Sequence, residues 1–207
     1  MKLNKILLTG LLATLFGTGL ATSDSALAAS SSCAGSPTCT TGAVPLDFQI
    51  IIPQFVRLRI GTAASTDTIV FDMTLTPDLI GDSSSVAGTG GDAGAGEVNV
   101  RVMANGAGLT VNVDAATSGT GAGIDCQAAS GSCVPGTDFI NWDEITVTPN
   151  GCTVAPPLLN NGGTGTANYP AAAPLKESCT WIYTYDNTTV PPNGTYVGTV
   201  TYTATSV

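Results

Sequence analysis

The chain has 207 residues, with 6 basic and 15 acidic side chains and no histidine. Without an imidazole there is no histidine-based catalytic triad, no histidine-ligated zinc and no side chain whose ordinary pKa lies near neutrality. The formal net charge of -9 also argues against nucleic acid and anionic membranes as partners, because both bind basic patches.

The first residues have the pattern of a signal peptide. Lys2 and Lys5 precede an apolar run over residues 6–20, and the Ala-Leu-Ala sequence at 26–28 is typical of a cleavage site. We therefore predict a cleaved signal peptide over residues 1–28, and no membrane span after cleavage because no second long apolar run follows. Cleavage removes two lysines and one aspartate and leaves 179 residues with 4 basic and 14 acidic side chains.

Six cysteines follow the predicted cleavage site, and an even number in an exported chain indicates disulfides. Six cysteines allow about fifteen pairings, and pairing of nearest neighbours is the prediction because each bond then closes a loop-like segment. A metal cluster is the competing interpretation, but there is no CxxC spacing and no histidine. The predicted pairs are Cys33 with Cys39, Cys126 with Cys133, and Cys152 with Cys179.

Apolar and polar residues alternate with a period of two along most of the remaining chain, which predicts strands. We expect an all-β fold: a single Ig-like, two-sheet antiparallel sandwich of about eight strands over residues 44–207, preceded by a cysteine-containing segment at 29–43. Helix is expected only as a turn near 77–80. Long Gly/Ser/Pro-rich loops are predicted at 81–96, 115–138 and 149–178. The predicted strands are 44–52, 56–60, 69–75, 98–103, 109–113, 140–148, 180–185 and 195–206.

Carboxylates are the only candidate acid–base groups, and they do not indicate an enzyme. Asp143 and Glu144 are adjacent, and neighbours on a strand point to opposite faces, so the pair is expected to be a solvated strand end. Asp82, Asp92 and Glu97 flank a glycine-rich loop that allows a calcium site, although their spacing does not match an EF-hand loop. No other cofactor is predicted.

Two tryptophans allow a carbohydrate-stacking hypothesis. Trp181 alternates with Tyr183 and Tyr185 on one face of a predicted strand, which favours core packing instead. The position of Trp142 stays open.

The final predicted strand carries no charge over residues 195–206. An uncharged strand of this length is an edge that monomeric proteins normally protect, so it is either paired inside the sheet or pairs subunits with one another. One face of this strand consists of Tyr196, Gly198, Val200, Tyr202 and Ala204.

Residues 191–207 begin with a Pro-Pro-Asn-Gly turn and continue as a Tyr-x-Gly-x-Val-x-Tyr run. This segment resembles the last strand of bacterial fimbrial subunits of the chaperone–usher pathway. The resemblance implies an exported subunit that passes a periplasmic chaperone, and an incomplete sandwich that is completed by an N-terminal strand of the next subunit in a surface fibre. The donor candidate is the alternating run of Val44, Leu46, Phe48, Ile50 and Ile52, which could instead be the first strand of its own sheet.

Two functions of different classes follow. The first is an exported structural or adhesive protein of the cell surface, a fimbrial or matrix subunit that assembles with itself or with other fibre subunits by β-strand addition. The alternative is a monomeric secreted β-sandwich module that binds glycan or calcium through its long loops.

Overall fold

The computed structural model describes residues 30–35, 37–115, 123–127, 131–159, 163–170 and 174–206. The chain divides into two units, Met1–Ile51 and Ile52–Val207, and the second unit contains every strand that the structure describes. Its elements are β1 (Val56–Ile60), β2 (Ile69–Val70), the 3-10 helix η1 (Pro77–Leu79), β3 (Val86–Ala87), β4 (Thr89–Gly90), β5 (Glu97–Ala104), β6 (Leu109–Asp114), β7 (Gly123–Cys126), β8 (Phe139–Asn141), the 3-10 helix η2 (Trp142–Glu144), β9 (Ile145–Asn150), β10 (Thr164–Tyr169), β11 (Leu175–Tyr185), β12 (Tyr196–Val197) and β13 (Thr201–Ser206).

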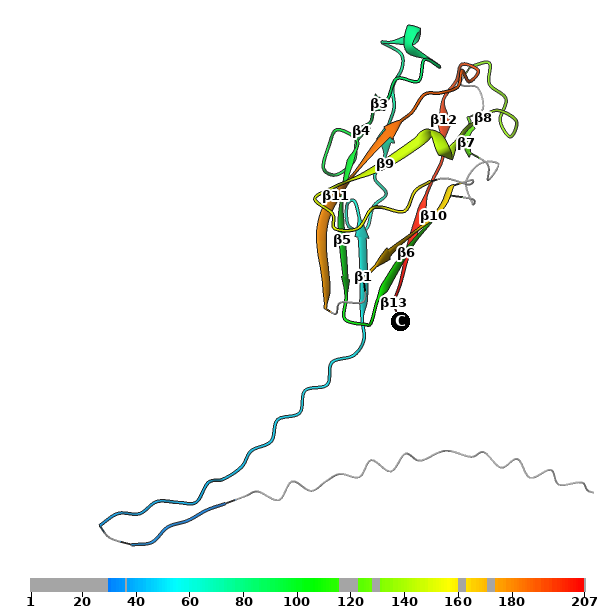
Figure 1. Cartoon of the computed structure of the whole chain (residues 1–207). Helices are drawn as coiled ribbons and strands as arrows, with labels where there is room; N and C mark the ends of the chain where they lie inside the picture. Colours follow the sequence, from blue (N-terminus) through cyan, green and yellow to red (C-terminus); the bar gives the residue numbers. More distant parts are fainter. Residues whose placement is uncertain are drawn as a thin grey trace, which may run out of the picture. The chain divides into compact units, whose positions relative to one another are not determined.

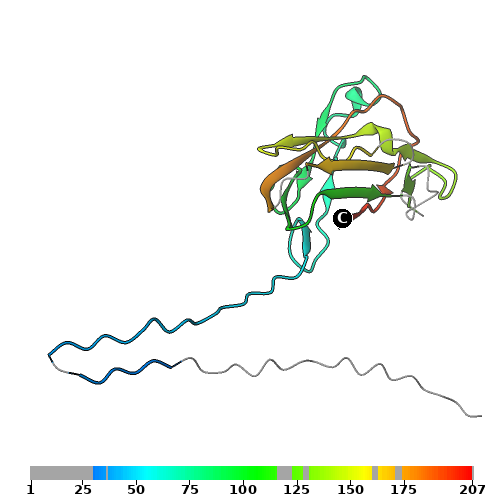
Figure 2. The same cartoon turned by 60° about the horizontal axis from the view of Figure 1, so that its bottom comes forward.

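Two antiparallel sheets form the layers of this unit (Figures 1 and 2). In the first, β5 lies between β1 and β11, and β11 also pairs with β3 and β9. In the second, β6 lies between β10 and β13. The order β12-β7-β8 and the pair β2-β4 make two smaller sheets. The predicted all-β antiparallel sandwich is confirmed.

The core lies between the two layers and follows from the period-two pattern of their central strands. On β5, every second residue from Val98 to Ala104 is at most 4% exposed, and on β6 the same alternation buries Leu109, Val111 and Val113. Trp181 on β11 is fully buried among them, which confirms its predicted place in the core. Because successive strand residues point to opposite faces, each central strand contributes one apolar face to the interior.

Two aromatic contacts connect the layers. The hydroxyl oxygens of Tyr183 on β11 and Tyr202 on β13 lie 2.8 Å apart in a hydrogen bond. The ring of Tyr202 also packs against Trp181, with the ring centroids 5.4 Å apart. The last strand is therefore attached to the opposite layer through Tyr202 as well as to its neighbour β6.

Buried tyrosines predict how stability depends on pH. Burial raises the pKa of Tyr169, Tyr183 and Tyr185 to about 12, and that of Tyr202 well above its ordinary value near 10. Since the folded chain holds these protons to a higher pH than the unfolded chain, ionisation favours unfolding. We expect the free energy of unfolding to change little between about pH 7 and pH 9, and to fall steeply from about pH 10 to pH 12.

Denaturant unfolding at a series of pH values measures this dependence, with tyrosinate absorbance followed in parallel. Tyrosine ionisation is expected to coincide with unfolding. Ionisation of all five tyrosines near pH 10 while the chain stays folded would contradict the prediction.

Several predicted elements differ from the structure. Residues 44–52 form no strand. The predicted strand 69–75 is limited to β2, because Asp72 Oδ1 accepts hydrogen bonds from both the N–H and the hydroxyl of Thr74, 2.9 and 2.7 Å away, and turns the chain there. The predicted turn near 77–80 is present as η1, whereas β10 lies in a segment that was predicted to be a loop.

The final strand is also broken, although an uninterrupted one is predicted. β12 and β13 are separated by residues 198–200, and they belong to different sheets. At the break, a Cβ on Gly198 would lie 2.6 Å from the ring of Trp142. Only a residue without a side chain fits against this ring, so the break lies at the point where Trp142 packs on the chain.

Candidate assembly edge

Two strand edges face each other at one side of the sandwich. β1 pairs only with β5, and β13 pairs only with β6, so among the described residues no backbone ladder joins β1 to β13. We call this boundary the β1–β13 seam. Its apolar floor is half-buried and packs against the core, and it consists of Leu58, Ile60, Val200, Tyr202 and Ala204.

The space between the two edges is too narrow for a further strand. Parts of β1 and β13 approach within 8 Å between Cα atoms. A strand placed between them needs about 9.5 Å, twice the spacing of neighbouring strands. Gln54 Nε2 also donates a hydrogen bond to Ser206 Oγ, 3.4 Å away, at one end. Adding a strand therefore requires the two edges to move apart slightly.

Asn105, in the turn between β5 and β6, holds the residues that lead into β1. Its Oδ1 accepts a hydrogen bond from the Phe55 N–H at 2.7 Å, and its Nδ2 donates to the Pro53 carbonyl at 2.9 Å. The Asn105 N–H also donates to the Phe55 carbonyl at 3.3 Å. These three bonds, which we call the Asn105 clasp, fix the point at which the chain enters the sandwich. The Asn-Gly sequence at 105–106 is typical of a turn and does not indicate these contacts, so sequence analysis missed this role.

The segment before the clasp exposes a run of apolar side chains. Leu46, Phe48, Ile50, Ile51 and Ile52 are between 73% and 84% exposed, and Val44 is half exposed. Contiguous exposed apolar surface usually marks an interaction site in a soluble protein. The predicted assembly residues thus fall into two groups: five lie in this exposed segment, whereas Tyr196 lies in β12, Gly198 and Val200 lie at the break, and Tyr202 and Ala204 lie in β13.

Three disulfides join the cysteines as nearest neighbours in sequence, as predicted. Their Cα–Cα distances are 5.8 Å for Cys33–Cys39, 6.0 Å for Cys126–Cys133 and 5.1 Å for Cys152–Cys179. Three such bonds suggest an oxidising, extracellular environment.

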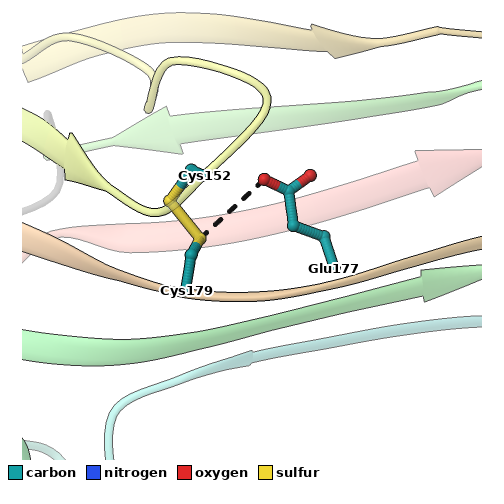
Figure 3. A group of neighbouring side chains, drawn as sticks. All are labelled: Cys152, Glu177 and Cys179. Carbon is teal, nitrogen blue, oxygen red and sulfur yellow. Dashed lines mark hydrogen bonds between the residues drawn. A yellow bond between two sulfur atoms is a disulfide. The ribbon is translucent and has the colours of Figure 1, made fainter.

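The third disulfide has a buried carboxylate beside it (Figure 3). Glu177 is 7% exposed, and its carboxylate accepts hydrogen bonds from the N–H and hydroxyl of Thr153, at 2.5 and 2.7 Å. The ligand-type atoms of Cys152, Glu177 and Cys179 lie within 4.8 Å of one another. Because both sulfurs are consumed in the S–S bond, they are not thiolates that could bind a metal. This cluster therefore fastens the segment after β9 to β11.

The carboxylates considered for calcium are not brought together. Asp82 Oδ1 accepts from the Ser84 N–H and from Asn187 Nδ2, and Asp92 accepts from the N–H and amide of Asn99. Among the described residues, Asp82, Asp92 and Glu97 form no group of the size that a metal ion needs. The calcium hypothesis gains no support from this arrangement.

The prediction of a solvated Asp143–Glu144 pair is wrong for Glu144. Asp143 is exposed, but Glu144 is 4% exposed and its carboxylate accepts hydrogen bonds from the N–H and hydroxyl of Thr188. The pair lies in η2 rather than on a strand, and Thr188 comes from a distant loop, so local sequence gave no signal of this burial. Trp142 is 4% exposed and Trp181 fully buried, so neither ring is available as a platform for sugar.

No helix within the described residues is long and apolar enough to cross a membrane. Comparison of the chain with family models, with characterised proteins and with solved structures gives no match.

Proposed function

We propose that the protein is an exported structural subunit of a cell-surface fibre or matrix, and that subunits join by β-strand addition. The segment 44–52 of one subunit enters the β1–β13 seam of another and becomes a strand there. A periplasmic chaperone that covers the exposed apolar residues before assembly fits the same surface.

A single observation carries this proposal: the chain has an exposed alternating apolar segment, and within the described residues β1 and β13 each leave one edge without a ladder partner, with an apolar floor between them. Each feature is unfavourable alone, since unpaired edges and exposed apolar patches both promote association. Together they are complementary, because an added strand satisfies the backbone groups of the edges and buries the apolar residues of the donor. The monomeric glycan-binding alternative is less well supported, because both tryptophans are buried.

Charged substitutions on the apolar face of the donor segment test strand addition. We expect the mature chain, residues 29–207, to give a ladder of oligomers in electrophoresis without heating and monomers after boiling. The Phe48→Asp/Ile50→Asp double variant is expected to stay monomeric. Loss of two buried apolar side chains removes on the order of 3–6 kcal/mol, which weakens association by more than about a hundredfold.

The matched control is Gln49→Asp, which adds a charge on the opposite face of the same segment and is expected to keep the ladder. Strand addition would be contradicted by a wild-type chain that is monomeric at every concentration. It would also be contradicted if the double variant and the control gave the same series of oligomers in electrophoresis.

A further inference from the structure

All four basic side chains in the described part of the chain lie on one face of the first sheet. On β1, Arg57 is directly opposite Met103, and Arg59 is directly opposite Arg101. On the other side of β5, Lys176 pairs with Met103 and Ser178 with Arg101, so the cations occupy two neighbouring rows. Arg101 and Met103 alternate with the buried residues of β5 and point away from the core. The cations that lie opposite them on β1 and β11 point the same way. We call Arg57, Arg59, Arg101 and Lys176 the basic face.

Across the residues that the structure describes, the basic face has no acidic side chains paired with it, although acidic residues outnumber basic ones in this protein. Arg59 and Arg101 are like charges directly opposite each other on paired strands, which is destabilising. Within the described residues, no carboxylate forms an ion pair with any member of the basic face, and Arg59 Nε is buried without a hydrogen-bond partner. An anion beside Arg59 would relieve both deficits.

The donor segment carries one charge, and that charge is negative: Asp47. Successive residues of a strand point to opposite faces. When Phe48 and the other even-numbered apolar residues face the floor of the seam, Asp47 must face outward. On β1 the same rule places Leu58 and Ile60 toward the core and Arg57 and Arg59 outward. A donor strand beside β1 therefore presents Asp47 on the basic face.

We propose that the subunit that receives the donor segment is a second copy of this chain, and that Asp47 of the incoming copy pairs with Arg59 of the receiving copy. This inference rests on the proposed strand addition. Arg59 is the best position for the carboxylate, since Arg57 lies two residues away on the same strand and Arg101 lies directly opposite. Side chains opposite each other on neighbouring strands lie within roughly 5 Å at Cβ, which allows a direct contact.

The ion pair also determines the register of the added strand. A slip of one residue would turn the apolar donor face outward, so it is already excluded by burial. A slip of two residues keeps the apolar face inward and is distinguished only by side-chain fit and charge. Because Asp47 is the single charge of the segment, and Arg59 has both Arg57 and Arg101 beside it, pairing with Arg59 favours one register among those that burial allows.

The Asn105 clasp makes a second copy the recipient rather than the chain's own seam. To fold back beside its own β1, the donor segment would need a tight hairpin at residues 53–55. Such hairpins favour positive φ at their central residues, and none of residues 52–55 has one. Asn105 also bonds to the backbone of both Pro53 and Phe55, which holds this stretch in place.

Charge reversal on both sides tests the pairing. The receptor is the mature Phe48→Asp/Ile50→Asp chain, whose own donor segment is inactivated and cannot compete with an added peptide for the seam. The probes are synthetic peptides of residues 42–54, wild type and Asp47→Lys, and their dissociation constants are measured by fluorescence anisotropy. Introducing Arg59→Glu into the receptor is expected to weaken binding of the wild-type peptide about tenfold, and to strengthen binding of the Asp47→Lys peptide by a similar factor. High salt is expected to reduce both differences.

Lys176→Glu in the same receptor is the matched control. It makes the same charge change on the same face, but β5 separates β11 from β1, so we expect less than about a twofold effect. Arg59→Glu places a carboxylate opposite Arg101, which favours folding, so weaker binding by this variant reports on the peptide contact rather than on loss of the fold. If both peptides bind every receptor equally, strand addition stands and the Asp47–Arg59 pairing is wrong. If no peptide binds any receptor, strand addition itself fails.

Discussion

Replacing both Cys152 and Cys179 with serine is expected to lower the free energy of unfolding by about 3.5 kcal/mol. The disulfide closes a loop with a sequence separation of 27, and the unfolded chain gains the most freedom when a long loop is opened. The bond also attaches the segment after β9 to β11, which pairs with three other strands. A loss of this size is a large part of the 5–15 kcal/mol that typical domains have.

The Cys126→Ser/Cys133→Ser pair is the comparison variant. Its loop has a sequence separation of 7, for which the same relation gives about 2.5 kcal/mol. Urea unfolding of the two double variants and the wild type, all without reductant, measures the difference. Equal losses, or a larger loss from the short loop, would show that loop length does not govern the contribution of these bonds.

Replacing Trp181 with alanine is expected to destabilise the sandwich by about 3–5 kcal/mol and to lower its melting temperature by about 10 °C. Trp181 is fully buried between the layers, and its ring packs against Tyr202 on β13. The alanine substitution leaves a cavity beneath one edge of the β1–β13 seam. Relative to the wild type, we therefore expect amide hydrogen exchange to accelerate more in β13 than in β9. Trp181 Nε1 has no hydrogen-bond partner, so Trp181→Phe removes no hydrogen bond and should destabilise much less.

Val197→Ala provides the surface control. Val197 is about half exposed, and a substitution there is expected to change stability by less than about 0.5 kcal/mol. Thermal unfolding followed by near-ultraviolet circular dichroism compares the three variants. If the Trp181→Ala chain has the same melting temperature as the wild type, the ring does not stabilise the contact between the layers.

The alternating pattern correctly predicted the central strands, which bury one apolar face in the core. It failed where a contact with a residue far away in the sequence determines the local structure. β5, β6 and β11 follow it because each lies between two strands. The break at Gly198 depends on Trp142, which is 56 positions earlier in the chain, and the burial of Glu144 depends on Thr188. Sequence patterns describe neighbours along the chain, so contacts of this kind leave no periodic signal.

The sequence likewise predicted only some parts of the candidate assembly edge. Alternation over 44–52 indicated the proposed donor segment, and the uncharged C-terminal run indicated one of the two edges of the proposed assembly site. The second edge, on β1, and the Asn105 clasp depend on which strands pair and which stay unpaired. Alternation along the predicted strand 56–60 is enough to place Arg57 and Arg59 on the face opposite Leu58 and Ile60, but their position beside Arg101 requires the register of β1 against β5.

The absence of histidine by itself excluded imidazole chemistry, and the spacing of the cysteines and apolar residues predicted the local disulfides and the faces of the central strands. These properties follow from residue type and short-range geometry. Within the described residues, only the tertiary structure decided which backbone edges lack a ladder partner and that the cations gather on one face, because strand pairing brings together segments far apart in the chain. The lack of histidine thus goes with a protein for which we propose recognition through strand edges and the basic face.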